Sequence, residues 1–184
     1  MHKILFSFLL LFITTTAAVH AQEIKWMSMN EALKAQKENP KKIFMDAYTD
    51  WCGPCKMLDK NTFSNKDVAK YVNENYYPVK FNAEGTDTIN YKEKTFKNAN
   101  YIPGKSGRNN PHDFARAIGI RAYPSLVFFD EKGELIGPIP GYRSPQELEV
   151  FLKLFSKEDY KTINTQDAFQ EYARDFEHEF ETSK

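Results

Sequence analysis

Two cysteines separated by two residues, Cys52 and Cys55, constrain this chain more than any other feature, because it has no other cysteine. The run before them, residues 43–48, is mostly apolar and predicts a buried strand. From Cys52 to about Lys60 the residues favour a helix. Pro54 is tolerated in its first turn, where the missing N–H costs no hydrogen bond. The pair is therefore expected where a strand ends and a helix begins.

That position has chemical consequences for the two thiols. A thiol at a helix N-terminus faces unpaired N–H groups and the positive end of the helix dipole, which both favour the reactive thiolate. Cys52 is therefore expected to be the acidic, attacking sulfur, exposed at the edge of the sheet. Cys55, one turn deeper, can attack the resulting mixed disulfide and release the partner. The spacing thus indicates a redox pair.

The motif Trp51-Cys52-Gly53-Pro54-Cys55-Lys56 resembles the active-site motif of the thioredoxin family. Three further features agree with the family pattern. They are Asp46, six residues before Cys52, the segment 118–126, which resembles the family's cis-proline segment, and Lys80-Phe81-Asn82, which resembles the end of its middle strand. The resemblance covers roughly residues 24–155, with an insertion. It extends to the thioredoxin domains of periplasmic disulfide-interchange proteins.

The resemblance implies catalytic roles for Cys52, Cys55 and Asp46. Buried beneath the cysteines, Asp46 would have a raised pKa and could relay a proton to or from Cys55. The alternative is a carboxylate in water at the end of a strand. Lys80 is a supporting residue that could pair with Asp46, or face solvent.

Substrate binding is assigned by the same resemblance to Trp51, Gly53, Pro54, Tyr123 and Pro124. A cis peptide bond at Pro124 would place backbone beside Cys52, where an extended substrate could pair with Tyr123. Trp51 is either a partly exposed, substrate-facing aromatic residue or ordinary packing.

The expected fold class is α/β, a thioredoxin-like three-layer fold with a mixed central sheet between helices. Residues 22–155 form the thioredoxin-like domain, with an insertion at about 83–109 before the cis-proline segment. Residues 156–184 form a C-terminal helical extension. Its apolar residues Phe169, Tyr172, Ala173, Phe176 and Phe180 continue one helical face, which favours docking on the domain over binding of a partner.

Several local signals predict individual elements. Capping boxes at Ser28 and Ser144 begin two helices, and Asn110 is expected to cap a third. A short first strand is expected at 24–26. Strands are expected at 77–81 and 126–129, followed by an edge strand from Leu135 that contains Gly137, Pro138 and Pro140. Within the insertion, residues 88–98 are interpreted as a helix. Four basic residues of the insertion either face water or contact partners; they are Lys92, Lys94, Lys97 and Arg108.

The first 21 residues predict an export signal, with Lys3 before an apolar core and a small-residue cleavage pattern ending at Ala21. The alternative, an uncleaved membrane anchor, is disfavoured because the apolar stretch is about half of the roughly 20 residues that a spanning helix needs. The protein is therefore expected to be exported, to a periplasm or another extracytoplasmic compartment.

Composition argues against other functions. The chain carries 25 basic and 25 acidic residues, which disfavours nucleic acid or an anionic membrane as its main partner. A structural zinc needs four ligands, and only His112 and His178 follow the export segment, at spacings unlike those of metal sites. Neither histidine is tied to Cys52, which disfavours cysteine-protease chemistry. No metal or organic cofactor is expected beyond the redox-active cysteine pair.

These features predict an exported thiol–disulfide oxidoreductase that acts on protein substrates. The Gly-Pro dipeptide between the cysteines resembles reducing thioredoxins and favours a reductant, recharged by another thiol protein such as a membrane thiol reductase. The alternative is a non-catalytic binding module on the same scaffold. In that case the Cys52–Cys55 disulfide would be structural, and the insertion and the C-terminal helix would be the binding surfaces.

Overall fold

The computed structural model describes residues 23–182, so the predicted export signal at 1–21 lies outside the described residues. A four-stranded sheet in the order β2-β1-β5-β6 forms its centre. Strands β1 (Lys42–Tyr48) and β2 (Tyr76–Asn82) are parallel. Strands β5 (Ser125–Phe129) and β6 (Leu135–Pro140) run antiparallel to their neighbours. The mixed sheet agrees with the sequence prediction, including β6 as an edge strand.

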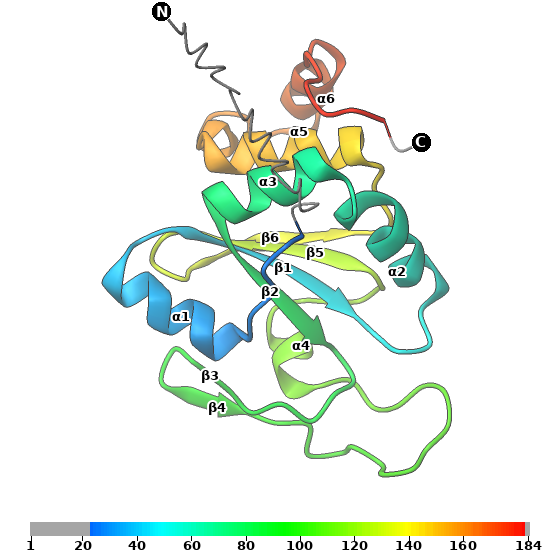
Figure 1. The fold of residues 1–184 in the computed structure, drawn as a ribbon. Coiled ribbons are helices and arrows are strands. Elements are labelled where there is room, and N and C mark those ends of the chain that lie inside the picture. Colours follow the sequence, from blue (N-terminus) through cyan, green and yellow to red (C-terminus); the bar gives the residue numbers. More distant parts are fainter. Residues whose placement is uncertain (1–22, 183–184) are drawn as a thin grey trace, which may run out of the picture.

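Helices cover both faces of this sheet (Figure 1), which gives the three layers expected from the sequence. On one face lie α1 (Met29–Glu38) and α4 (Asp113–Ala117). On the other lie α2 (Gly53–Leu58), α3 (Lys66–Asn75) and α5 (Pro145–Ser156). The chain thus has the α/β, thioredoxin-like fold class that the sequence predicts.

The alternation of side chains along β1 places an acid beneath α2. Ile43, Met45 and Ala47 join the apolar core on the α1 side, whereas Phe44 joins the core on the α2 side. Because successive strand side chains point to opposite faces, Asp46 shares the face of Phe44. It is paired in register with Lys80 of β2, which therefore lies beside it.

The predicted helix starts are confirmed where the signal is a capping box. Ser28 and Ser144 accept hydrogen bonds from Glu31 N and Glu147 N, and both glutamates bond back to the cap. The third prediction is wrong by two residues, since His112 rather than Asn110 caps α4. His112 Nδ1 accepts from Phe114 N at 3.0 Å, so a buried imidazole replaces the usual short polar side chain.

The insertion differs from its predicted form. Residues 88–98 make no helix but a hairpin of β3 (Ile89–Tyr91) and β4 (Lys94–Phe96). Lys92 and Glu93 adopt left-handed backbone angles, the geometry of a tight two-residue turn. Ile89 and Tyr91 are buried because their spacing of two puts both on one face of a strand. The insertion therefore contributes to the core.

Smaller differences occur at other element ends. The expected first strand at 24–26 is reduced to a single bridge between Met27 and Val79. The helix that follows the cysteines ends at Leu58 as α2 and continues as one turn of π-helix, Asp59–Phe63.

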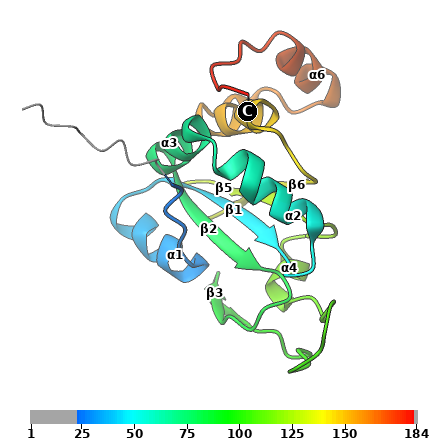
Figure 2. The same ribbon diagram turned by 45° about the vertical axis from the view of Figure 1, so that its right-hand side comes forward.

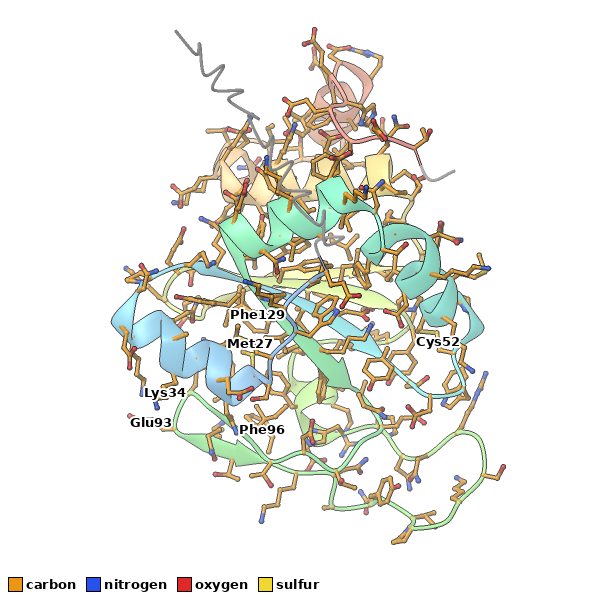
Figure 3. The ribbon with its side chains drawn as sticks, viewed as in Figure 1. Met27, Lys34, Cys52, Glu93, Phe96 and Phe129 are labelled. Carbon is orange, nitrogen blue, oxygen red and sulfur yellow. A yellow bond between two sulfur atoms is a disulfide. The ribbon has the colours of Figure 1, made fainter. Side chains whose placement is uncertain are left out.

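In Figure 3 Cys52 lies at the opposite side of the molecule from Glu93 at the hairpin tip. The hairpin and the cysteine pair thus occupy different ends of the fold.

The C-terminal segment contains a short 3₁₀ turn, Asp159–Lys161, and α6 (Gln166–Arg174). Figure 2 shows α6 beyond α5, on the side away from the sheet. Phe169 stacks on Phe151 of α5 with ring centroids 5.2 Å apart. The expected helical face does not extend to Phe176 and Phe180, because the helix ends at Arg174. Phe180 is instead buried through an extended segment.

Candidate active site

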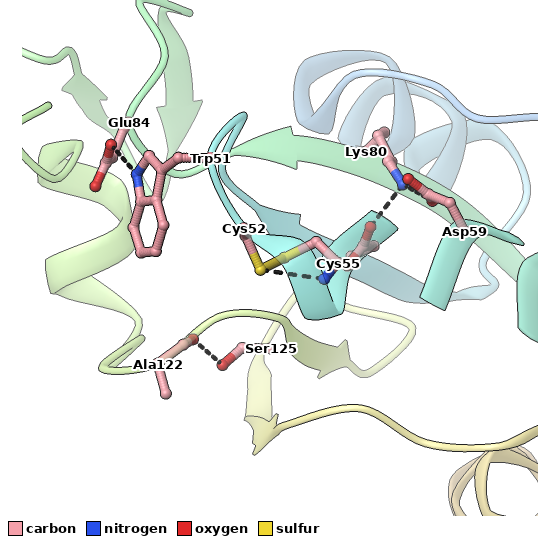
Figure 4. The surroundings of a disulfide bond; sticks show 9 residues. Trp51, Cys52, Cys55, Asp59, Lys80, Glu84, Ala122 and Ser125 are labelled. Carbon is pink, nitrogen blue, oxygen red and sulfur yellow. Dashed lines mark hydrogen bonds and ion pairs between the residues drawn. A yellow bond between two sulfur atoms is a disulfide. The ribbon is translucent and has the colours of Figure 1, made fainter. Parts of the chain in front are cut away.

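Cys52 and Cys55 lie where the sequence predicts, at the junction of β1 and α2, and their sulfur atoms form a disulfide (Figure 4). Cys52 is the N-cap residue of α2, and Pro54 occupies the first turn. The backbone N–H of Cys55 donates to Cys52 Sγ at 3.1 Å. An N–H of the first helical turn, which has no acceptor within the helix, therefore donates to the first sulfur. The same contact would stabilise the negative charge of a Cys52 thiolate.

The predicted exposure of Cys52 is wrong for this oxidised pair. Cys52 and Cys55 are each only 2% exposed. The sulfur of Cys52 is turned back over the first turn of α2, where it is bonded to Cys55. The neighbouring Gly53 and Pro54 are exposed, so the motif reaches the surface at these two residues.

Asp46 is the buried carboxylate of the site, with no exposed surface. Lys80 Nζ lies 2.7 Å from its Oδ2, whereas Oδ1 has no hydrogen-bond partner among residues 23–182. Burial raises the pKa of Asp46 to about 6, although Lys80 opposes the shift. An acid with this pKa can take up or release a proton near neutral pH.

Asp59, which the sequence analysis did not single out, is the third charged residue of this site, beside Asp46 and Lys80. Its carboxylate forms an ion pair with Lys80 (Figure 4). The ammonium therefore bridges Asp46 and Asp59. Burial alone would lower the pKa of Lys80, but the two carboxylates raise it. The available signal was the spacing, since Asp59 lies four residues after Cys55 and thus one helical turn along the same face.

The aromatic residues predicted to bind substrate lie together. Trp51 packs edge-to-face on Tyr123, with ring centroids 6.0 Å apart, and both are half-buried. The Tyr123–Pro124 peptide bond is cis. Pro124 is buried, and its carbonyl accepts from Gly141 N at 2.8 Å. Trp51, Tyr123 and the cysteine pair are thus brought to one edge of the sheet.

Two residues that the sequence analysis did not assign to this edge also contact Trp51. Glu84 Oε2 accepts from Trp51 Nε1 at 2.8 Å, and the Arg108 guanidinium lies 4.4 Å from the centre of a Trp51 ring. A signal for Glu84 was available, because it follows the end of β2. The ends of parallel strands such as β1 and β2 meet at one edge of the sheet. No comparable signal in the sequence predicted that Arg108 would lie beside Trp51.

The two histidines considered as metal ligands lie elsewhere. His112 Nε2 donates to Asp87 O at 2.7 Å, and His178 Nδ1 lies 3.3 Å from Glu149 Oε2 near the C-terminal segment. Between residues 23 and 182 there is no cluster of three or more His, Cys, Asp or Glu side chains arranged to hold a metal ion.

A sequence profile of the thioredoxin-like domain matches residues 29–156, which is well over half of the chain. The protein belongs to the thioredoxin-like family. The match includes the cysteine pair, Asp46 and the cis-proline segment. The family and its disulfide-forming pair together make the protein a member of a group of thiol–disulfide oxidoreductases, as the motif predicts.

Curated relatives include the thiol:disulfide interchange protein DsbD of Campylobacter jejuni strain RM1221, 33% identical over 138 residues. That alignment covers 74% of this chain and 20% of the relative. DsbD of Pectobacterium atrosepticum is 22% identical over 148 residues, covering 78% of this chain and 22% of the relative. The thioredoxin-like chain therefore spans about a fifth of the length of these relatives.

Solved structures support the same fold. A candidate disulphide-isomerase from Bacteroides thetaiotaomicron has a TM-score of 0.51 and 28% identity, covering 73% of this chain and 94% of the other. A thioredoxin-fold protein from Helicobacter pylori has a TM-score of 0.55 and 13% identity, covering 85% and 86%. Among the helices of the described region, none has the length and apolar character needed to cross a bilayer.

Proposed function

We propose that the protein exchanges disulfides with protein substrates outside the cytoplasm and works mainly as a reductant. One observation carries the disulfide-exchange chemistry of this proposal. The cysteine pair lies above a buried acid, Asp46, whose pKa is raised by burial to about 6. A structural disulfide needs no proton acceptor, whereas dithiol chemistry near neutral pH does.

The proposed reaction begins with both cysteines reduced. The Cys52 thiolate attacks one sulfur of the substrate disulfide, and the other substrate sulfur leaves as a thiolate that takes up a proton. Asp46 then accepts the Cys55 proton, and the Cys55 thiolate attacks Cys52 Sγ in the mixed disulfide. This step forms the Cys52–Cys55 disulfide and releases the second substrate thiolate, which is also protonated. In total, two electrons and two protons pass to the substrate: solvent, which took up the Cys52 proton, supplies one proton, and Asp46 releases the Cys55 proton as the other.

The substrate would bind along the exposed turn and the aromatic pair. Gly53 and Pro54 are exposed next to the buried cysteines, and Trp51 packs edge-to-face on Tyr123 at the same edge of the sheet. By the family resemblance, an extended substrate segment would pair with the backbone of Tyr123 beside Pro124. Lys80 would support Asp46 by holding its charged form.

The compartment and the electron source are part of the same proposal. The predicted export signal at 1–21 and the similarity to disulfide-interchange proteins support a site of action outside the cytoplasm. A membrane thiol reductase is the proposed electron donor, which would reduce the Cys52–Cys55 disulfide with two electrons. The proposal involves no organic cofactor and no metal ion.

Single-cysteine variants test the chemistry directly. With dithiothreitol as the electron source, the parent should reduce a protein disulfide catalytically, while Cys52→Ser should not exceed the rate of dithiothreitol alone. Cys55→Ser should accumulate a mixed disulfide with the substrate, visible as a shift on a non-reducing gel. Equal catalysis by both variants and the parent would refute the proposal.

The direction of electron flow is tested by equilibration of the pair with a glutathione series. A reductant of the thioredoxin type should have a potential of about −270 mV. A value near that of strong oxidants, about −120 mV, would reverse the proposed direction without affecting the exchange chemistry.

The burial of Cys52 favours a second candidate function, a binding module with a structural disulfide. After reduction, alkylation with iodoacetamide separates the two. The proposed enzyme should react at its first thiol faster than free cysteine at pH 6, because a stabilised thiolate is the reactive form. A module should resist reduction or leave this thiol unreactive.

A further inference from the structure

The last residues of the insertion and the active-site tryptophan donate hydrogen bonds to the same buried carboxylate. Glu84 is 8% exposed, and its Oε2 accepts from both Trp51 Nε1 at 2.8 Å and Asn109 N at 2.7 Å. One oxygen atom thereby joins the residue before Cys52 to the residue after Arg108. The position of Arg108 relative to the redox pair is set by this shared acceptor.

The loop that carries Arg108 is also closed by its own hydrogen bonds. The Asn109 side chain accepts from Ile102 N at 3.0 Å and donates to Ile102 O at 2.9 Å. Asn110 Nδ2 donates to Asn100 O at 2.6 Å, and Asn98 Nδ2 donates to Asn110 O at 2.8 Å. A loop held in this way presents its side chains with little further loss of conformational entropy on binding.

Arg108 is an exposed cation of this loop. Its guanidinium lies over the Trp51 ring at 4.4 Å, and Arg108 takes part in none of the ion pairs within residues 23–182. An arginine stacked on an aromatic face keeps its N–H groups in the plane of the guanidinium, free to bind a carboxylate in a bidentate manner. The stacked guanidinium therefore offers oriented N–H donors to the carboxylate of an acidic side chain.

We infer that Arg108 determines substrate specificity by binding a carboxylate that lies close to the reacting cysteine of the substrate. The preferred partner is then a protein segment with Asp or Glu beside its disulfide. This inference rests on the proposed function, because it assigns a substrate class to the same site. A purely structural alternative is that Arg108 balances the charge of Glu84.

Two short disulfide peptides that differ only in their flanking residues test this assignment. One carries Glu and the other Lys on both sides of the same disulfide, and the reduced protein is regenerated with dithiothreitol. An exposed ion pair contributes up to roughly 1 kcal/mol, so the parent should prefer the acidic peptide by about fivefold in kcat/KM. Arg108→Gln should bring the ratio to about one, and Arg108→Glu should reverse it.

Lys105→Gln is the matched control, since Lys105 is an exposed cation of the same loop with no side-chain contact to Trp51. It should keep the ratio of the parent. The preference should also weaken at high salt, which screens exposed charges. Because each ratio is measured within one variant, a general loss of activity does not change it.

The outcomes separate the inference from the function it rests on. If the parent reduces both peptides equally well, the inference is overturned and the oxidoreductase proposal stands. If Arg108→Gln shifts Trp51 fluorescence but keeps the preference, Arg108 has a packing role and the inference is also overturned. If the reduced parent acts on neither peptide nor a protein disulfide, the proposed function itself fails.

Discussion

Asp46 beneath the cysteine pair and Glu149 on α5 are both fully buried carboxylates, and each has a lysine Nζ at 2.7 Å. Their other partners differ. Glu149 also accepts from Glu179 N at 2.9 Å and from Phe180 N at 3.1 Å, whereas Asp46 receives no backbone N–H. Each region thus contains a buried carboxylate paired with a lysine, but only the carboxylate of Glu149 also accepts backbone hydrogen bonds.

This difference separates a structural carboxylate from a reactive one. Backbone donors from Glu179 and Phe180 compensate the desolvation of Glu149, which thereby holds the C-terminal segment on α5. Asp46 has only Lys80, and burial raises its pKa to about 6. The fixed backbone donors at Glu149, which Asp46 lacks, are therefore the structural difference between the two buried acids.

The largest expected effect is a loss of stability in Glu149→Ala. The substitution leaves two backbone N–H groups without their acceptor and removes one of the two carboxylates paired with Lys153. Breaking a buried pair typically costs about 3–5 kcal/mol. Denaturation with guanidinium, followed by circular dichroism, measures this loss. Disulfide reduction per folded molecule should not change. A cost below about 1 kcal/mol would mean that Glu149 is not a structural anchor.

Asp46→Asn should have the opposite effect on stability. The folded-state pKa of about 6 lies above the ordinary 3.8, so the parent loses stability as pH rises through this interval. The variant avoids that loss and should be about 2–3 kcal/mol more stable at pH 8, with no such gain below pH 4. Unfolding curves at the two pH values test the sign.

The same variant should also reduce protein disulfides about 100-fold more slowly at pH 7, because a general base has been removed. Asp59→Asn is the matched control, since Asp59 is exposed and contacts the same lysine. It should have a much smaller effect on both stability and rate. Equal rates for Asp46→Asn and the parent would exclude the proton relay.

Lys80→Met should raise the pKa of Asp46 further above about 6, because the ammonium is the main group that lowers it. A shift of about one unit, equivalent to about 1.4 kcal/mol, is the expected size. Carboxyl titration by NMR with labelled aspartate measures it. A pKa that stays at about 6 would show that burial and the remaining groups set it without Lys80.

The smallest expected effect is that of Phe169→Ala in α6. It removes a half-buried ring stacked on Phe151, and an aromatic pair contributes about 0.5–1.5 kcal/mol beyond its buried area. Hydrogen exchange should become faster in α6 and stay unchanged in the central sheet. Faster exchange around Asp46 as well would indicate that the two regions are coupled.

Features that depend on residues close in the chain were predictable from the sequence. The capping boxes at Ser28 and Ser144 and the position of the cysteine pair follow from spacings of a few residues, because hydrogen bonds of one helical turn specify them. The alternation along β1 similarly places Asp46 on the face beneath α2. The oxidoreductase family and the α/β fold class were accessible for this reason.

Tertiary structure decided what depends on distant segments. Ile89 and Tyr91 form a strand because the core accepts their common face, although the same residues also fit a weak helical pattern. Arg108 reaches Trp51 only because a closed loop returns to the sheet edge. The burial of Cys52 is likewise a property of the assembled site. Such contacts join residues far apart in the chain, and no local spacing encodes them.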